Sequence, residues 1–311
     1  MKIFFLGTPD YALRSLKRLA AEHEIVGVLA QPDRRVGRHG KRVPPPTAAF
    51  ARQKGIRLFQ PERPRGKEFR RELESLDADL AVVIAYGHLL RPWLIDMCPQ
   101  GMINAHGSIL PAYRGAAPIQ RAILDGCTET GVTVQKVVFE MDAGPVLLVE
   151  KTAIGPEETS GQLFERMAAL SAEALSKGVA LIESGEAEYV EQDHQAASYA
   201  AKLTRDEGEA DWSRSAVRLA RAARAYSPWP TLYTRTPDGK LLKILSARAT
   251  RDGGDQDPGE IVSASGRGLC VQTGDGVLEL LRVQAEGKRA MEAGDFLRGA
   301  HLVGGDRLGP A

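Results

Sequence analysis

Hydrophobic positions in the first two thirds of the chain form short apolar runs that alternate with amphipathic stretches. Residues 3–6 form an apolar run that ends at Gly7, and apolar positions at helical spacing follow over residues 11–19. Residues 80–85 form an unbroken apolar run, which is typical of a strand buried on both faces of a sheet. Further predicted elements are a strand at 25–30 and helices at 48–54 and 160–184. Strands alternating with helices predict an α/β fold with a mostly parallel sheet.

The pattern changes in the last third of the chain. A helix is predicted at 215–226, and turn residues such as Pro237-Asp238-Gly239 separate the short apolar runs that follow it. These runs lie at 243–247, 259–262, 269–273 and 277–283. They predict a small, mostly antiparallel sheet or barrel.

The length of 311 residues is enough for two domains that each bury a core. We predict a catalytic domain at 1–190 and a C-terminal domain at 207–311. A polar, uneven stretch at 191–206 is predicted to link them.

The composition excludes several classes of protein. Lys and Arg total 41 and Asp and Glu total 40, so no global field attracts the protein to nucleic acid or to an anionic membrane, and such a partner needs a local patch. Cys98, Cys127 and Cys270 are far apart, which argues against a disulfide framework or a zinc site. We expect a reducing cytoplasm and no metal. The first apolar run is too short for a signal peptide, and no later run reaches membrane-spanning length.

The turn after the first predicted strand stands where a dinucleotide-binding protein carries its glycine fingerprint. Pro9 and Ala12 occupy the second and third glycine positions after Gly7. Pro9 removes a backbone donor and the close backbone approach that a pyrophosphate needs. A dinucleotide cofactor is therefore not expected, and the turn is interpreted as structural, although the helix N-terminus could attract an anion.

Asn104 and His106 are polar residues in a segment that begins with the apolar Ile103. Asn104 and His106 lie two residues apart, so they project to the same side of an extended segment. Gly107 and Pro111 then stop the strand, which puts the pair at its carboxyl end, where open parallel sheets bind ligands. A single histidine is more often a structural residue, so this segment alone leaves both interpretations open.

Asp142 follows another apolar run in the sequence Glu140-Met141-Asp142-Ala143-Gly144, where an aspartate is commonly an ordinary turn former. Together with Asn104 and His106 it suggests a catalytic set for the transfer of an acyl or formyl group. Transfer of an acyl or formyl group to an amine creates an oxyanion, and an Asn amide and an imidazolium are suitable donors to that charge. Asp142 would then keep His106 charged and relay protons.

Two basic segments could bind a phosphate backbone or could be ordinary solvated surface. The segment 33–42 has five cations and one anion and is predicted to be a mobile loop that reaches nucleic acid at the catalytic cleft. Its cations are Arg34, Arg35, Arg38, Lys41 and Arg42. In the C-terminal part, Arg214, Arg218, Arg221 and Arg224 recur at helical spacing, but residues 207–311 carry 15 Lys and Arg against 14 Asp and Glu. A basic stripe and an amphipathic helix with a solvated arginine face remain equally open there.

The chain closely resembles the methionyl-tRNA formyltransferase family over both halves. In the first half the matching stretches are Gly7-Thr8-Pro9-Asp10, Gln31-Pro32-Asp33-Arg34, Ala85-Tyr86-Gly87, 103–111, 114–120, 129–133 and Asp142-Ala143-Gly144. In the second half they are Lys202-Leu203, Asp211-Trp212, Pro228-Trp229-Pro230 and Thr273-Gly274-Asp275-Gly276. Val137-Val138 and Ala143 depart from the residues common in the family, which affects details of the pocket.

The resemblance implies a Rossmann-like formyltransferase domain joined to a smaller OB-like β-barrel domain that helps to hold tRNA. It implies 10-formyltetrahydrofolate as the formyl donor, initiator methionyl-tRNA as the acceptor, and N-formylmethionyl-tRNA for translation initiation as the product. By position, Asn104, His106 and Asp142 correspond to the catalytic set. Folate contacts are implied for Ser108, Ile109, Leu110, Pro111, Ala85, Tyr86 and Gly87, and tRNA contacts for Arg34, Arg35, Arg38, Lys41 and Arg42. We expect a monomeric, cytoplasmic enzyme without a metal.

Two alternatives use the same motifs. An amino-sugar or ribonucleotide formyltransferase would share the catalytic trio and the folate donor, and we expect it to lack a use for the basic 34–42 segment and the second domain. A catalytically silent tRNA- or folate-binding module would keep the fold, but the intact Asn104, His106 and Asp142 argue against it.

Overall fold

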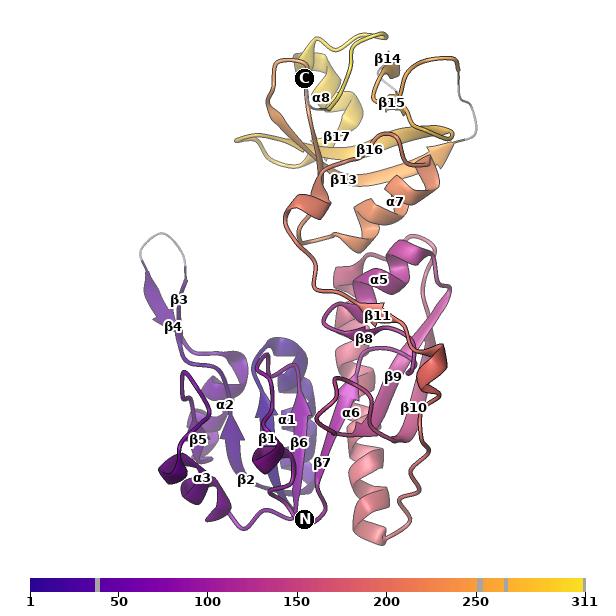
Figure 1. Ribbon diagram of the computed structural model, residues 1–311. Coiled ribbons are helices and arrows are strands. Elements are labelled where there is room, and N and C mark those ends of the chain that lie inside the picture. Colours follow the sequence, from indigo (N-terminus) through magenta and orange to yellow (C-terminus); the bar gives the residue numbers. More distant parts are fainter. Residues whose placement is uncertain (37–39, 251–253, 266–267, 310–311) are drawn as a thin grey trace. The chain divides into compact units, whose positions relative to one another are not determined.

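The computed structural model describes residues 1–36, 40–250, 254–265 and 268–309 (Figure 1). Internal contacts divide the chain into two compact units. The first contains Met1–Pro118, Glu129–Thr152 and Phe164–Ala200, and the second contains Ile119–Thr128, Ala153–Leu163 and Ala201–Ala311. Two short internal segments therefore pack with the C-terminal part of the chain. The domain boundaries that we infer at 190 and 207 stay a prediction.

A seven-stranded sheet forms the core of the first unit, in the order β10-β9-β7-β6-β1-β2-β5. Its strands are β1 (Lys2–Gly7), β2 (Glu24–Leu29), β5 (Leu58–Phe59), β6 (Leu80–Ile84), β7 (Met102–His106), β9 (Glu129–Lys136) and β10 (Val146–Ala153). The pairs from β5 through β2, β1 and β6 to β7 are parallel, and β9 pairs with β7 antiparallel. The predicted α/β fold with a mostly parallel sheet is confirmed.

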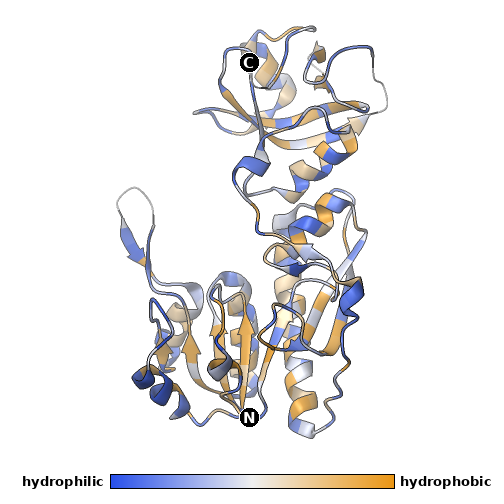
Figure 2. Cartoon of the chain, in the orientation of Figure 1, coloured by the Kyte–Doolittle hydropathy of each residue, from blue (hydrophilic) through white to orange (hydrophobic). Residues whose placement is uncertain are grey.

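The central strands are apolar because helices or loops cover both of their faces. All five residues of β6 are buried, as the unbroken apolar run predicts. Figure 2 shows the hydrophobic residues concentrated along these strands. The helices of this unit are α1 (Asp10–Glu22), α2 (Pro46–Lys54), α3 (Lys67–Glu74), α4 (Pro92–Ile95) and most of α6 (Ser160–Ser184). In α1 the buried Tyr11, Leu16 and Leu19 follow the predicted helical spacing, and burying one such side chain contributes about 1.5–3 kcal/mol.

The carboxyl ends of β1, β2 and β6 are tied together by one hydroxyl group. Thr8 follows β1, and its Oγ1 donates to the carbonyl oxygen of Tyr86 at 3.1 Å. Thr8 Oγ1 also accepts the backbone N–H of Gln31 at 3.3 Å. Gln31 follows β2 and Tyr86 follows β6, so Thr8 links the ends of three neighbouring strands. These ends lie at the carboxyl edge of the sheet, where parallel sheets bind their ligands.

The basic segment near residue 38 differs from its prediction as a loop. The described residues form a two-stranded antiparallel hairpin, β3 (Arg34–Val36) and β4 (Lys41–Val43), with Arg35 opposite Arg42 (Figure 1). Figure 2 shows that this hairpin is hydrophilic. The ladder uses backbone groups only, so a charged sequence can form it where its side chains stay in water.

The second unit contains an antiparallel sheet in the order β12-β13-β16-β15-β14, with β17 paired to β16. Its strands are β12 (Leu232–Arg235), β13 (Leu241–Thr250), β14 (Ile261–Ser265), β15 (Gly268–Gln272), β16 (Val277–Ala285) and β17 (Met291–Glu292). Its helices include α5 (Pro118–Asp125), which begins at the end of the first unit, α7 (Ala216–Ala225) and α8 (Ala293–Ala300). The predicted small, mostly antiparallel second domain is confirmed.

The arginine row on α7 meets backbone carbonyl groups. Arg218 Nη1 donates to the carbonyl oxygen of Leu124 at 2.6 Å, and Arg221 Nη1 donates to that of Asp125 at 3.2 Å. Both acceptors lie in the last turn of α5, whose carbonyl groups have no partner within the helix. Arg224 likewise donates to a carbonyl oxygen in the same unit. These arginines therefore hold structural segments, a role that neither of our two sequence interpretations included.

Candidate active site

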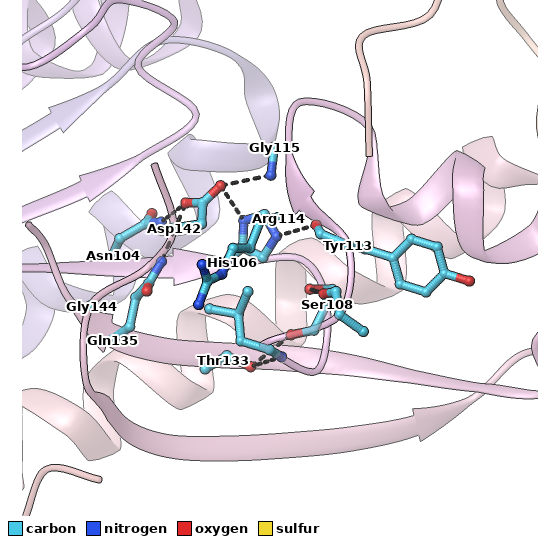
Figure 3. A network of polar contacts seen from close by, with 12 residues as sticks. Asn104, His106, Ser108, Tyr113, Arg114, Gly115, Thr133, Gln135, Asp142 and Gly144 are labelled. Atoms are coloured by element: carbon cyan, nitrogen blue, oxygen red, sulfur yellow. Dashed lines mark hydrogen bonds and ion pairs between the residues drawn. The ribbon is translucent and has the colours of Figure 1, made fainter. Parts of the chain in front are cut away.

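The carboxylate of Asp142 is the centre of a polar network in the first unit (Figure 3). Its Oδ2 accepts the backbone N–H of Gly115 at 2.8 Å. Its Oδ1 accepts the side-chain amides of Gln135 at 3.2 Å and Asn104 at 3.4 Å. The Asp142 side chain is only 15% exposed, so these donors take the place of water around the charge.

The backbone around Asp142 is in a tight turn that follows β9. Asp142 has φ of 51°, in the left-handed region that aspartate tolerates better than most residues. Two residues later, a Cβ atom on Gly144 would lie 1.8 Å from the carbonyl oxygen of Lys136. Gly144 is therefore required for the chain to fold back on the end of β9, and this close return orients Asp142 toward β7.

The imidazole of His106 lies between two acceptors. Its Nδ1 is 3.5 Å from Asp142 Oδ2, and its Nε2 is 2.8 Å from the carbonyl oxygen of Tyr113. A carbonyl oxygen only accepts, so Nε2 carries a proton, and the ring can donate to both neighbours only as the imidazolium. Figure 3 shows the Tyr113 ring directed away from the carboxylate, so this residue contributes its backbone to the site.

The structure brings together the three residues that the sequence predicts as the catalytic set. Asn104 and His106 alternate on β7, opposite Gln135 and Thr133 of β9, and both side chains reach Asp142. His106 is 6% exposed, so its contact with Asp142 is largely shielded from solvent. The catalytic role of the trio stays a prediction.

The sequence did not predict the buried side chains Gln192 and Arg114, which hold the turn around Asp142. Gln192 Nε2 lies 2.9 Å from the carbonyl oxygen of Asp142 and 2.7 Å from that of Gly144. Its Oε1 accepts Nε and Nη2 of Arg114 at 3.1 and 2.7 Å. Gln192 lies in the stretch that we interpreted as a linker, where polar composition alone cannot distinguish a buried amide from a solvated one.

Four of the predicted folate contacts lie in the loop that follows β7. Thr133 Oγ1 donates to the carbonyl oxygen of Ser108 at 2.7 Å and accepts the N–H of Leu110 at 3.0 Å, which anchors this loop to β9. The hydroxyl of Ser108 donates to the carbonyl oxygen of Ala112 at 2.6 Å and closes the loop. The remaining members of the set are Ile109 and Pro111. Their contacts with folate stay a prediction.

The other predicted folate contacts follow β6, the strand next to β7. Ala85 has φ of 48° and Gly87 has φ of 84°, so the chain turns sharply at the carboxyl edge. Tyr86 between them is buried, and burial raises its pKa to about 12. This segment therefore exposes Ala85 and Gly87 at the edge of the sheet, while the side chain of Tyr86 packs inward.

A groove of about 590 Å³ opens beside these segments. It is lined by Glu62, Arg63, Pro64, Arg65, His88, Leu89, Leu90, Arg91, Pro92 and Phe139. Leu89 is 72% exposed and Phe139 is 63% exposed, although both are apolar. Leu89 lies two residues after Gly87 and Phe139 three residues before Asp142, so two segments that carry predicted site residues contribute to the lining of the groove. Three arginines against one glutamate favour an anionic ligand group in it.

The predicted tRNA contacts lie on the β3–β4 hairpin. Arg34, Arg35, Lys41 and Arg42 are exposed there, and Arg38 lies outside the described residues. Arg34 donates to the side chain of Gln31, which links the base of the hairpin to the sheet edge. Near that base, hydrogen bonds from Arg52 and then Gln60 lower the pKa of Asp33. Binding of tRNA to the hairpin stays a prediction.

Within the described residues, no group of three or more His, Cys, Asp and Glu side chains could hold a metal ion. In the same part of the chain, no helix is both long and apolar enough to cross a membrane.

Comparison with known proteins identifies the family. The model of the formyl transferase family matches residues 1–179, and that of the formyl transferase C-terminal domain matches residues 202–301. The chain is 43% identical to the methionyl-tRNA formyltransferase of Pseudomonas entomophila over 99% of this chain and all of that protein. It is 40% identical to that of Hydrogenovibrio crunogenus over 98% of this chain and 97% of that protein.

Solved structures share the fold at low identity. The sugar 3N-formyl transferase WlaRD aligns with a TM-score of 0.66 at 15% identity, over 93% of this chain and 99% of its own. HypX from Aquifex aeolicus in complex with tetrahydrofolic acid aligns with a TM-score of 0.63 at 17% identity, over 96% of this chain. The match spans 48% of HypX. The family predicted from the sequence motifs is confirmed: the chain belongs to the methionyl-tRNA formyltransferase family of formyl transferases.

Proposed function

We propose that this chain transfers the formyl group of 10-formyltetrahydrofolate to the α-amine of initiator methionyl-tRNA. The observation that carries the proposal is the convergence of Asn104 and His106 on the Asp142 carboxylate, in a chain that matches methionyl-tRNA formyltransferases over its whole length. The names of the curated relatives agree with the function predicted from the sequence. Cytoplasmic localisation and a monomeric state stay predictions.

Asn104 and His106 stabilise the negative charge that develops during transfer. The neutral amine attacks the formyl carbon, a carbon–nitrogen bond forms, and the formyl oxygen becomes an oxyanion. The Asn104 amide has two N–H groups, of which one points to Asp142 at a long 3.4 Å, and the imidazolium of His106 supplies a second donor. Each donor contributes on the order of 10²–10³ in rate.

Asp142 keeps His106 in its charged form and serves as the local proton acceptor. After attack, the amine nitrogen carries an extra proton, and the bond from the formyl carbon to folate N10 must break. The Asp142 carboxylate is the anionic group beside His106, so it can take this proton. Delivery of the proton to N10 as that bond breaks yields the N-formyl amine and tetrahydrofolate.

The groove beside the site has the chemistry that the donor requires. Folate has an aromatic body and an anionic end with carboxylates. The exposed apolar side chains of Leu89 and Phe139 can contact the body, and Arg63, Arg65 and Arg91 can pair with the carboxylates. The backbone that Ala85 and Gly87 present at the sheet edge suits hydrogen bonding to a heterocycle.

The exposed hairpin supports an RNA acceptor. Arg35, Lys41 and Arg42 place their charges on an element whose backbone is already paired, which suits electrostatic contact with phosphates. The chain as a whole is nearly neutral, so this local patch would provide the attraction.

An amino-sugar acceptor is the second candidate, because WlaRD aligns over 93% of this chain. That coverage corrects one expectation. A sugar formyl transferase also extends over both units, so the second domain alone does not distinguish the two acceptors. The basic hairpin and the identity of 43% to a methionyl-tRNA formyltransferase favour tRNA.

A transfer assay with labelled donor tests both the reaction and the acceptor. Labelled 10-formyltetrahydrofolate is incubated with initiator methionyl-tRNA, uncharged tRNA, a small amine or a nucleotide-linked amino sugar. We expect label only on the charged tRNA, and label on the amino sugar would favour the second candidate. Asn104→Ala and His106→Ala should each lose orders of magnitude in kcat with the fold intact. Near-normal transfer by both variants would contradict the catalytic assignment.

A further inference from the structure

Behind the carboxylate of Asp142 lies a directional chain of three buried polar side chains. Arg114 donates to Gln192 Oε1, Gln192 Nε2 lies 3.1 Å from Gln135 Oε1, and Gln135 Nε2 donates to Asp142 Oδ1. Arg114 is 1% exposed, Gln135 is 2% exposed and Gln192 is 7% exposed. Water therefore has little access to this chain, and each group depends on the next for its hydrogen bonds.

Arg114 determines the orientation of both amides. A guanidinium has only donors, so it faces the oxygen of Gln192 and turns the nitrogen of Gln192 toward the turn. That nitrogen meets three acceptors, which are the carbonyl oxygens of Asp142 and Gly144 and the side-chain oxygen of Gln135. A flipped amide would put oxygen against oxygen at each of these contacts. Gln135 is oriented in the same way, with its nitrogen toward Asp142.

Gln192 also holds the strained backbone of the Asp142 turn. Its amide reaches the carbonyl oxygens on both sides of Ala143, and Asp142 itself has φ of 51°. A residue in the left-handed region persists where its surroundings enforce it. Gln192 supplies such a constraint from a segment 50 residues further along the chain.

We propose that Gln192 is a positioning residue for formyl transfer, which it supports by holding Asp142 in the orientation that receives His106. The inference rests on the proposed function for its catalytic consequence, but its structural part can be measured without substrates. Arg114 acts through Gln192 by fixing its amide. Of the predicted catalytic set, Gln192 contacts only the backbone of Asp142, and the hydrogen bonds of the described residues do not join it to Asn104 or His106.

The first experiment compares Gln192→Met with Gln272→Met. Gln272 is a matched control because it is also 7% exposed and its amide lies 3.0 Å from the carbonyl oxygen of Thr273, in the second unit. Both substitutions keep the volume, remove a buried amide and should lower Tm to a similar extent. Only Gln192→Met should lower kcat, by on the order of 10²-fold, with KM for both substrates nearly unchanged. Equal kcat losses in the two variants would overturn the proposal.

The second experiment follows the Gly115 amide by hydrogen exchange without substrate. Its N–H donates to Asp142 Oδ2, so its protection reports on the position of the carboxylate. In Gln192→Met, exchange at Gly115 should accelerate by about tenfold or more, while exchange at Leu110, whose N–H is bonded to Thr133, stays unchanged. Unchanged protection at Gly115 would overturn the positioning role. If Gly115 responds but the wild-type chain formylates no methionyl-tRNA, the proposed function fails and the structural role stands.

Gln192→Glu provides a test that depends on pH. The introduced carboxylate would face three acceptors, so kcat should be low where this group is ionised. Protonation restores one donor, so the ratio of the kcat of Gln192→Glu to that of the wild type should rise as pH falls. A ratio that does not change with pH would contradict the requirement for a donor at this position.

Discussion

His106 Nε2 lies 2.8 Å from the carbonyl oxygen of Tyr113, while Nδ1 of the same ring faces Asp142. Both ring nitrogens therefore face acceptors within the protein. For His106 to donate to an oxyanion, one of these contacts must be exchanged for the substrate. The contact with Tyr113 is the candidate for exchange, because a carboxylate is a stronger acceptor for an N–H group than a neutral carbonyl oxygen.

Asp142→Asn should show the effect of removing the negative charge of this residue while the size of its side chain is kept. The amide keeps the size of the side chain but replaces one acceptor with a donor, so it opposes either Gly115 N–H or the amides of Gln135 and Asn104. We expect kcat to fall on the order of 10²–10³-fold. The exposed Asp96, converted to Asn, is the control and should behave like the wild type in steady-state kinetics. A kcat for Asp142→Asn within a few-fold of the wild type would contradict a charged role for Asp142.

Gly144→Ala should destabilise the protein and impair transfer together. The new Cβ would lie 1.8 Å from the carbonyl oxygen of Lys136, and backbone must shift to remove the clash. We expect a loss of about 1–3 kcal/mol in the free energy of unfolding, measured in urea. Gly299→Ala is the control, because nothing lies within 4 Å of its Cβ position on α8, and it should gain up to about 1 kcal/mol. Equal effects of the two substitutions would contradict the close return at Gly144.

Removing the cations of the hairpin should weaken binding of tRNA and reduce its dependence on salt. Arg35→Ala, Lys41→Ala and Arg42→Ala should each raise KM for methionyl-tRNA and lower the slope of log KM against log salt by up to about one unit, while KM for folate stays constant. Lys17→Ala removes an exposed cation from α1 and serves as the control. Equal slopes in wild type and hairpin variants would exclude phosphate contacts by these residues.

Arg218→Ala should act on stability and leave the salt dependence of tRNA binding unchanged. Arg218 donates to the carbonyl oxygen of Leu124 at 2.6 Å, and its loss leaves the end of α5 without that donor. We expect a loss of about 1 kcal/mol in the free energy of unfolding. Arg214 pairs with Asp211 on the surface, so Arg214→Ala should change stability by less than about 0.5 kcal/mol. A reduced salt slope in Arg218→Ala would instead support a direct contact with RNA.

Stability should decrease at alkaline pH because of buried acids. Burial raises the pKa of the Cys98 thiol to about 12, and burial raises that of Tyr11 to about 12 against the effect of its bond to Ser171. The unfolded chain loses these protons near their ordinary pKa values of 9.0 and 10.0, whereas the folded protein retains them. The free energy of unfolding should therefore fall as pH rises from about 9 toward 12. Urea unfolding across this range should show a shallower decline for Cys98→Ala, and parallel curves would contradict the assignment.

The elements that were predicted correctly are those that depend on hydrophobic periodicity. The apolar run of β6 predicts a strand buried on both faces, and the amphipathic pattern of α1 predicts a helix packed on one side. Together these patterns predict a sheet covered by helices. Asn104 and His106 could be placed together because alternation on a strand fixes their common side. Asp142 could be added to them on chemical grounds, as a carboxylate that supports an imidazolium, but its position opposite them could not be derived from periodicity.

The features that sequence could not predict depend on contacts between distant segments. Gln192 is polar in a polar stretch, and only the fold reveals that it is buried against Asp142. Arg218 has the spacing of a solvated helix face, and periodicity cannot distinguish a carbonyl partner from water. The hairpin was missed because its charges resemble those of a loop, although backbone pairing needs no apolar side chain.

The polar stretch after α6 limits where this protein can be divided or recombined. Gln192 and β11 (Tyr199–Ala200), which pairs with β8 (Arg114–Gly115), both lie beyond residue 190 but belong to the first unit. A hybrid protein joined at residue 190 would inherit Asn104, His106 and Asp142 from one parent and Gln192, which holds the Asp142 turn, from the other. Exchange of the C-terminal part between relatives should therefore be made after Ala200, where Gln192 and β11 remain with Asn104, His106 and Asp142.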